Sequence, residues 1–161
     1  MDRQYNNELT PELLATMDKS PFTIEQLTDM DDEARALVRE QDEYLRLHPV
    51  SAIWRQAVVG SLTRDGGKVS SASSEGEVIT SSGKSAGFAL VGDEVTYSDG
   101  STAHIVSGSG SSISSNGKGY ALVGSHLSNG DEIISTPQNY AVLCCHAGET
   151  MADDFLVAME M

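Results

Sequence analysis

The chain has 161 residues, of which 39% are hydrophobic and only 6% aromatic, and its formal net charge is −14. This length favours one domain, or one small domain with an appendage, and the negative charge argues against nucleic acid and anionic membrane surfaces as partners. No apolar run approaches the roughly 18–20 residues that span a bilayer, and no basic-then-apolar leader begins the chain, so neither stable membrane anchoring nor a secretory signal is expected.

Residues 1–50 contain no glycine and carry twelve acidic and five basic side chains. Thr23 and Gln26, three residues apart, form a capping-box pattern that marks the start of a helix. A further helix is expected from Asp32 until Pro49 ends it, because apolar residues recur there at helical spacing. The sequence therefore predicts an acidic, α-helical N-terminal extension.

Residues 60–130 have a different composition, since they hold fourteen of the fifteen glycines and many serines. Flexible linkers share such a composition, but here short apolar pieces recur between glycine and serine turns. Many short strands separated by tight turns are typical of an all-β unit.

A repeat runs through this region, because Gly60, Gly92 and Gly124 each end a similar apolar segment and lie 32 residues apart. Repeats of this length are too small to bury a core alone, so they stack or wrap together. Three copies predict a body with pseudo-threefold symmetry, whose third copy is truncated at residues 135–137. The turn pairs that follow the three glycines are Asp65-Gly66, Asp99-Gly100 and Asn129-Gly130.

The repeat is similar to the PAAR-repeat family, the small cones that cap the trimeric VgrG-type spike of type VI secretion systems and contractile phage tails. The Pro-Ala-Ala-Arg sequence that names the family is absent, and Gly119-Tyr120-Ala121-Leu122 stands in its place. The second copy resembles the family most, in Gly92-Asp93, residues 105–108, Asn116-Gly117-Lys118 and residues 121–124.

The resemblance implies a mainly β fold, a small cone of three pseudo-repeats of short antiparallel strands. The cone is expected over residues 56–137, between the helical extension of residues 1–55 and a C-terminal segment of residues 138–161. It implies a structural and non-enzymatic role at the apex of a membrane-puncturing spike, one copy per spike trimer. Such a protein is made in the cytoplasm and delivered by the apparatus, or is a virion component.

The contact with the spike is expected at the repeated Ala-Leu-Val-Gly segments, because apolar residues recur there at matching places. The alternative for each of these positions is the thin core of the cone. The residues assigned to the contact are Leu90, Val91, Leu122 and Val123.

Family members usually hold one zinc ion near the tip, with histidine and cysteine ligands from the turns. Here Asp65, Asp99 and Asn129 occupy those turns, and an Asp or Asn followed by Gly closes a turn without a metal. No cofactor is therefore expected. If a metal does bind, thiolates and imidazoles are the remaining ligands, although adjacent residues rarely chelate one ion well. These fallback ligands are His104, His126, Cys144, Cys145 and His146.

Two alternative functions stay open at this point. One is an adaptor, in which residues 1–50 attach an effector or a baseplate protein to the spike. The other is a secreted hydrolase with Cys145 as its nucleophile, although no sequence motif places a base beside that thiol. Cys144 and Cys145 are adjacent, so we expect reduced thiols and no disulfide between them.

Overall fold

The computed structural model divides into two compact units, which are described separately. The first, called the β unit, comprises Met1–Glu8, Trp54–Leu143 and Met151–Met161, and the second, called the helical unit, comprises Leu9–Ile53 and Cys144–Thr150. Residues 3–8 and 151–158 therefore group with the strands. Asn116, expected in a turn, lies outside the described residues. Those residues are 3–17, 22–111, 113–115 and 117–158.

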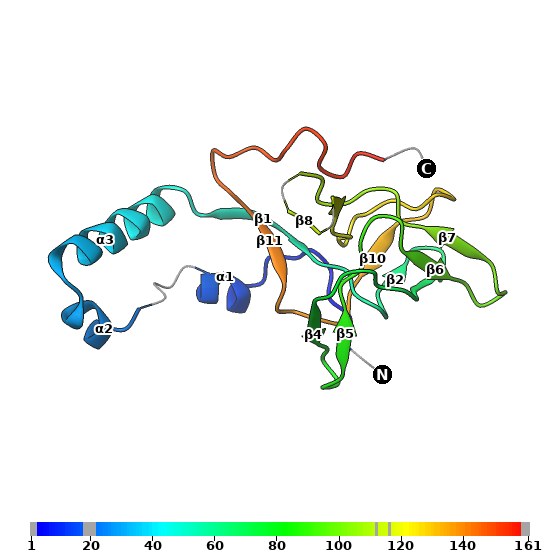
Figure 1. The fold of residues 1–161 in the computed structure, drawn as a ribbon, viewed down its shortest axis with the longest axis horizontal. Helices are drawn as coiled ribbons and strands as arrows, with labels where there is room; N and C mark the ends of the chain where they lie inside the picture. The colour runs from blue at the N-terminus through cyan, green and yellow to red at the C-terminus, as the bar shows by residue number, and fades with distance from the viewer. Residues whose placement is uncertain (1–2, 18–21, 112, 116, 159–161) are drawn as a thin grey trace. The chain divides into compact units, whose positions relative to one another are not determined.

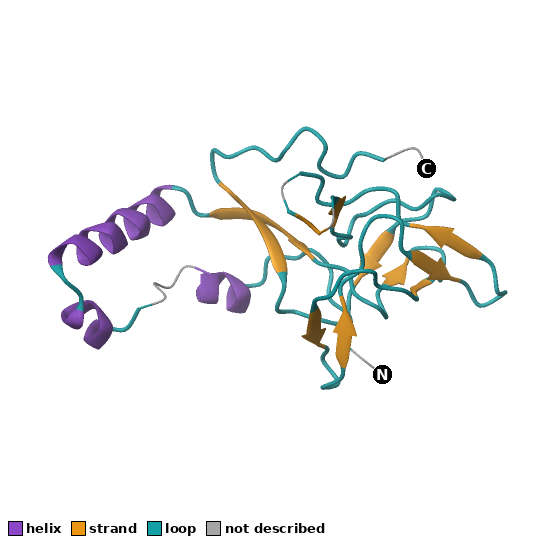
Figure 2. Ribbon diagram, viewed as in Figure 1, coloured by secondary structure: helices purple, strands orange, loops and turns teal. Residues whose placement is uncertain are grey.

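The helical unit contains the two expected helices, α2 (Ile24–Asp29) and α3 (Asp32–Leu47), together with α1 (Pro11–Met17) (Figure 2). The capping box of α2 is confirmed, because the Thr23 hydroxyl accepts from the Gln26 amide at 3.1 Å and the Gln26 side chain accepts from the Thr23 amide at 2.9 Å. No helix within the described residues has both the length and the apolar character needed to cross a bilayer.

Three β-hairpins, one from each repeat, form the body of the β unit (Figure 1). They join into a closed antiparallel sheet, because the last strand of the second hairpin bridges to the third at Ile105 and Leu127, and the third pairs with the first at Ile133 and Thr63. In the order of the sheet the named strands are β10 (Ile133–Ser135), β2 (Leu62–Thr63), β3 (Lys68–Val69), β6 (Glu94–Thr96) and β7 (Thr102–His104).

Three alanines form a ring of backbone hydrogen bonds in the β unit, and we call it the alanine ring. The Ala57 amide donates to the Ala121 carbonyl at 2.8 Å, Ala89 donates to Ala57 at 3.0 Å, and Ala121 donates to Ala89 at 2.9 Å. All three residues are fully buried. A closed ring of three equivalent bonds confirms the predicted pseudo-threefold symmetry, and alanine permits it because the three backbones approach one another closely.

The repeated glycines explain the rest of the Ala-Leu-Val-Gly pattern. Gly60, Gly92 and Gly124 have φ angles of 101°, 98° and 107°, a region that residues with a Cβ atom rarely occupy. The amide of each glycine donates to the returning strand of its own hairpin, at distances of 2.7 to 3.0 Å. Each repeat therefore needs a small residue in the ring and a glycine at the corner where the hairpin begins.

Two-stranded ribbons alternate with the hairpins along the chain, and the third ribbon is not formed by the third copy alone. The third ribbon joins β1 and β11, which come from the two ends of the repeat region. The Gln56 amide donates to the Ala141 carbonyl at 3.0 Å, as the Phe88 amide of the next repeat donates to Gly76 at 3.1 Å. The ribbons are β4 (Glu77–Ile79) with β5 (Ser85–Gly87), β8 (Ser114–Ser115) with β9 (Lys118–Gly119), and β1 (Val50–Arg55) with β11 (Val142–His146).

Candidate functional site

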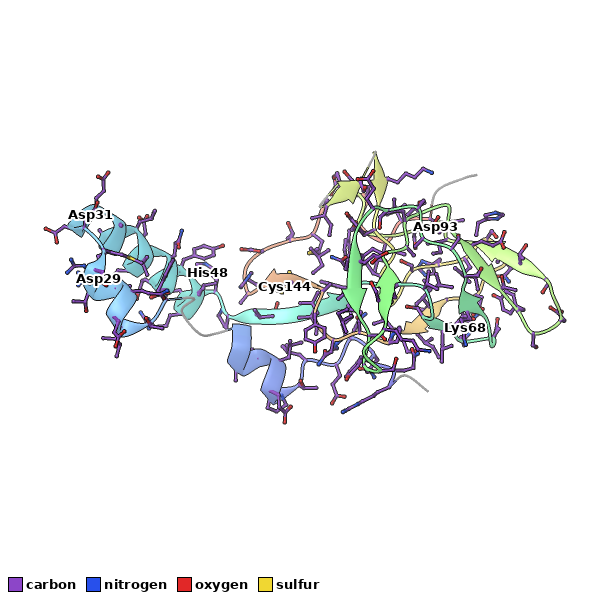
Figure 3. All side chains as sticks on the ribbon, turned by 60° about the horizontal axis from the view of Figure 1, so that its bottom comes forward. Asp29, Asp31, His48, Lys68, Asp93 and Cys144 are labelled. Atoms are coloured by element: carbon purple, nitrogen blue, oxygen red, sulfur yellow. The ribbon has the colours of Figure 1, made fainter. Side chains whose placement is uncertain are left out.

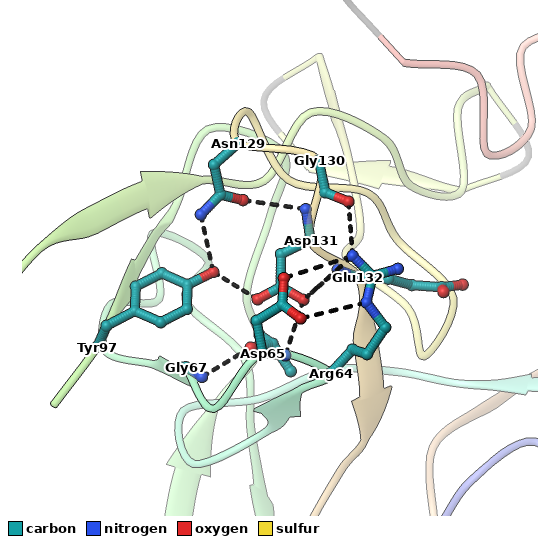
Figure 4. Close-up of polar contacts among 9 residues, drawn as sticks. Arg64, Asp65, Gly67, Tyr97, Asn129, Gly130, Asp131 and Glu132 are labelled. Atoms are coloured by element: carbon teal, nitrogen blue, oxygen red, sulfur yellow. Dashed lines mark hydrogen bonds and ion pairs between the residues drawn. The ribbon is translucent and has the colours of Figure 1, made fainter.

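The three hairpin turns have the same backbone geometry, and they are linked to one another by hydrogen bonds (Figure 4). We call residues 63–67, 97–101 and 127–131 together the turn end. In each turn the amide of the first residue donates to the carbonyl of the fifth at 2.9 Å. The fourth residue of each is a glycine with positive φ.

Asp131 lies at the centre of the turn end, and its side chain is fully buried. Its carboxylate accepts from the Tyr97 hydroxyl at 2.5 Å, from the Asp65 amide at 3.1 Å and from the Glu132 amide at 2.7 Å (Figure 4). The hydroxyl of Thr63 is a further hydrogen-bond partner. One side chain of the third turn is therefore bonded to both of the other turns.

The ionisation states of this pair follow from the same contacts. Burial by itself raises the pKa of Asp131, but hydrogen bonds from Thr63, Tyr97 and two backbone amides outweigh it and bring the pKa below its usual value. Burial, and then the hydrogen bond to Asp131, raise the pKa of Tyr97. At neutral pH the turn end thus holds an ionised carboxylate against a neutral phenol.

Comparison with known proteins fits this architecture. Residues 59–135 match the family model of the PAAR motif. Residues 59–135 therefore belong to the PAAR-repeat family. No curated protein and no solved structure matches the chain. The PAAR motif is typical of structural spike-tip proteins of contractile injection systems, which is the coarse function that the match supports.

The turn residues predicted from the PAAR pattern have three different roles. Asn129 joins the buried network, since its side chain accepts from the Asp131 amide at 3.0 Å and donates to the Tyr97 hydroxyl at 3.0 Å. Asp99 is exposed and, among the described residues, bonds only within its own turn, where contacts with Ser101 lower its pKa. The Asp65 carboxylate faces Arg64 at 3.4 Å.

Sequence reasoning missed the residues at the centre of the network, which are Thr63, Tyr97 and Asp131. A signal was present at the fifth turn position, where the first two repeats have Gly67 and Ser101 but the third has an aspartate. Whether such an aspartate is buried depends on contacts with two distant turns, so the residue type by itself does not predict it.

Zinc, which the PAAR family implies, does not fit the residues present at the turn end. The central group is a single carboxylate, and amide and hydroxyl donors point at it from two other turns. Those donors present positive dipole ends that repel a cation. Among the described residues, no cluster of three or more histidine, cysteine, aspartate or glutamate side chains has a metal-binding arrangement.

The fallback ligands do not form a cluster with one another. His104 and His126 are exposed in the β unit, and His126 Nδ1 lies 3.0 Å from the Ser107 hydroxyl. Cys144, labelled in Figure 3, belongs to the helical unit together with Cys145 and His146. There the ring of His146 contacts a backbone carbonyl, that of His48.

The hydrolase alternative gains no support from these thiols. Burial raises the pKa of Cys144, which disfavours the reactive thiolate. The Cys145 sulfur lies 3.7 Å from the His146 carbonyl and 3.5 Å from the Glu149 carbonyl, and neither group can accept the proton that a nucleophilic thiol must lose.

The residues assigned from sequence to the spike contact lie in the interior of the β unit. Leu90, Val91, Leu122 and Val123 are 1%, 8%, 0% and 4% exposed. Their side chains therefore offer almost no surface to a partner. A docking surface on the PAAR region requires other residues.

Proposed function

We propose that this PAAR-repeat protein caps the trimeric spike of a contractile injection apparatus, one copy per trimer, and sharpens it for membrane puncture. The alanine ring carries the proposal, because it gives one chain three equivalent faces about a single axis. A monomer with this internal symmetry can satisfy three equivalent strand edges at the end of a trimer. The protein is made in the cytoplasm and travels on the apparatus of a bacterial secretion system or of a phage tail.

The ribbons are the surface that fits a spike. The hairpins form a closed sheet, whereas β4–β5 and β8–β9 are two-stranded sheets whose outer edges can pair with a further strand. The carbonyls of Gly87 and Gly119 are excepted, because they accept from the Val59 and Val91 amides. Exposed edges of this kind pair with strands of a partner. Ile79 on β4 is 51% exposed, which supports an apolar contact there. We therefore assign the spike contact to the ribbons in place of the four buried residues.

The test is co-expression with a trimeric spike protein from the same genome, followed by mass measurement of the purified complex. We expect three spike chains to one copy of this protein. The Ile79→Asp variant should lose most of the complex, whereas Thr102→Asp, at an exposed position of the closed sheet, should keep it. A 3:3 complex, or a stable homotrimer of this chain alone, would contradict the proposal.

A second candidate function is that of an adaptor, supported by exposed apolar residues on α3. Leu37 and Leu47 are 56% and 59% exposed, and Tyr44 between them is 45% exposed. Intervals of seven and three residues place them along one side of the helix. An effector or baseplate protein bound there would be lost in the double variant Leu37→Glu and Leu47→Glu, while the spike complex should persist. Loss of the spike complex in that variant would argue against a separate adaptor surface.

A further inference from the structure

The buried carboxylate of Asp131 connects all three repeats. It belongs to the third turn, it accepts from the hydroxyl of Tyr97 in the second, and it accepts from the amide of Asp65 in the first. A metal ion with one ligand from each turn would make the same connection. We propose that Asp131 fastens the turn end in place of a zinc ion, so that this tip is metal-free.

Space at the turn end supports the proposal. The fifth position of the first turn is Gly67, and a Cβ atom there would lie 2.7 Å from Val95 Cγ1, 2.9 Å from Thr63 Oγ1 and 2.9 Å from Tyr97 Cε1. Real Cβ atoms do not approach other atoms so closely. The first turn therefore has no room for a ligand at the position that Asp131 occupies in the third turn.

Charge at the turn end supports it as well. The donors around Asp131 are two backbone amides, the Tyr97 phenol and the Thr63 hydroxyl, which together stabilise one negative charge. Arg64 adds a partly exposed positive charge, with Nη2 at 4.0 Å from the Asp131 carboxylate and at 2.9 Å from the Gly130 carbonyl. A divalent cation would meet this same set of positive groups.

The second turn is exposed, yet it keeps its conformation because it is held by its own hydrogen bonds. Ser101 stands where the third turn has Asp131, and its amide and hydroxyl both donate to the Asp99 carboxylate. That turn is closed by its own contacts, and only Tyr97 reaches inward. Asp99 is therefore a matched control for Asp131, since it is an aspartate in an equivalent turn and has no bond to another repeat in the part of the chain that the structure describes.

The experiment combines metal analysis with thermal melting of the full chain. Protein purified from zinc-supplemented cells should contain well under one equivalent of transition metal, and neither a chelator nor added zinc should change its Tm. Asp131→Asn should lower the Tm by about 5 °C or more, because one amide cannot accept every bond that the carboxylate accepts. Asp99→Asn should change the Tm by no more than about 2 °C.

Tyr97→Phe keeps the phenyl ring and removes one donor, so it should fold and melt between the wild type and Asp131→Asn. It serves as the decisive variant if Asp131→Asn does not fold. Stoichiometric zinc, or a chelator that lowers the Tm, would overturn the proposal. So would an Asp131→Asn or Tyr97→Phe variant that is no less stable than Asp99→Asn. None of these outcomes depends on docking to a spike.

Discussion

The alanine ring and the turn end are built from the same three repeats. The repeats have the same side chain in the ring, but different side chains at the turn end. In the ring, Ala57, Ala89 and Ala121 are identical and make the same bond to one another. At the turn end, Asp131 is buried, whereas its counterpart in the second repeat, Ser101, is exposed. The ring positions therefore have the same small residue in every repeat, whereas the equivalent turn positions differ in residue type.

This difference between the alanine ring and the turn end shows which positions of the fold can change residue type. Close approach of three backbones restricts the ring to small residues, so a change in one repeat disturbs the others. The turns share only backbone bonds and a glycine with positive φ, and within that frame the first turn has Gly67 and the third has Asp131. The side chains of the turns can therefore differ between repeats while the backbone of the hairpins stays the same.

The largest expected effect comes from charging the interior beside the ring. Val123 and Val59 are equivalent positions, but they are 4% and 38% exposed. Val123→Glu should abolish cooperative melting, because a buried carboxylate without a partner costs several kcal/mol. Val59→Glu should cost less than about 1 kcal/mol, because its side chain can reach water. Circular dichroism melts of both variants test this, and equal losses would mean that the three repeats are more alike than their burial indicates.

A buried arginine that breaks the threefold pattern should have the next largest effect. Arg55 is 1% exposed and stands where the other repeats have Gly87 and Gly119. Its guanidinium donates to the carbonyls of Asn6 and Glu8 and to the side chain of Asn139, so it fixes residues 5–8 on the β unit.

Arg55→Met removes these donors and so three partly buried hydrogen bonds to a charged group, which should cost about 2–4 kcal/mol. Hydrogen exchange should then become faster in residues 5–8, and Arg39→Met, an exposed position on α3, should leave both stability and exchange unchanged. Unchanged exchange in the Arg55 variant would show that other contacts hold this segment.

Local chemistry was predictable from sequence, whereas contacts between distant segments were not. The capping box at Thr23 and the role of Gly92 follow from residue types at short spacing. The pairing of β1 with β11 joins strands about ninety residues apart in sequence, and no turn signal connects them. The burial of Leu122 was undecided for the same reason, because an apolar position in a thin cone suits a core or a contact equally well.

The pH dependence of the turn end should distinguish Asp131 from Asp99. The pKa of Asp131 is lowered on folding from a value of about 3.9, so its stabilising effect is present above that pH and is lost as the pH falls through the folded pKa. The titratable side chains that contact it are Tyr97 and Arg64, whereas Asp65 and Glu132 donate to it through their backbone amides.

Between pH 5 and pH 7, the range above the unfolded pKa of about 3.9, the Tm gap between the wild type and Asp131→Asn should be constant. Below about pH 4 the gap should narrow, because the wild-type carboxyl then takes up a proton. The gap for Asp99→Asn should stay small throughout. A gap for Asp131→Asn that widens in acid would show that the carboxyl is protonated in the folded protein.

The smallest expected effect comes from making the repeats more alike. Asp93, labelled in Figure 3, accepts from the Leu90 amide at 2.7 Å, as Ser61 and Ser125 accept from the matching amides of their own repeats at 3.0 and 2.9 Å. Asp93→Ser restores the residue of the other two repeats and loses only the bonds to Ser73, so it should cost less than about 1 kcal/mol.

Asp93→Ala leaves the buried Leu90 amide without an acceptor and should cost about 1–3 kcal/mol. Chemical denaturation of the two variants side by side gives both values with the same reference state. If serine is as damaging as alanine, the bonds to Ser73 matter more than the bond at the corner, and the three repeats are then not interchangeable there. If serine is tolerated, the corner of each repeat needs only one short acceptor, and equivalence extends from the alanine ring to the first residue of each hairpin.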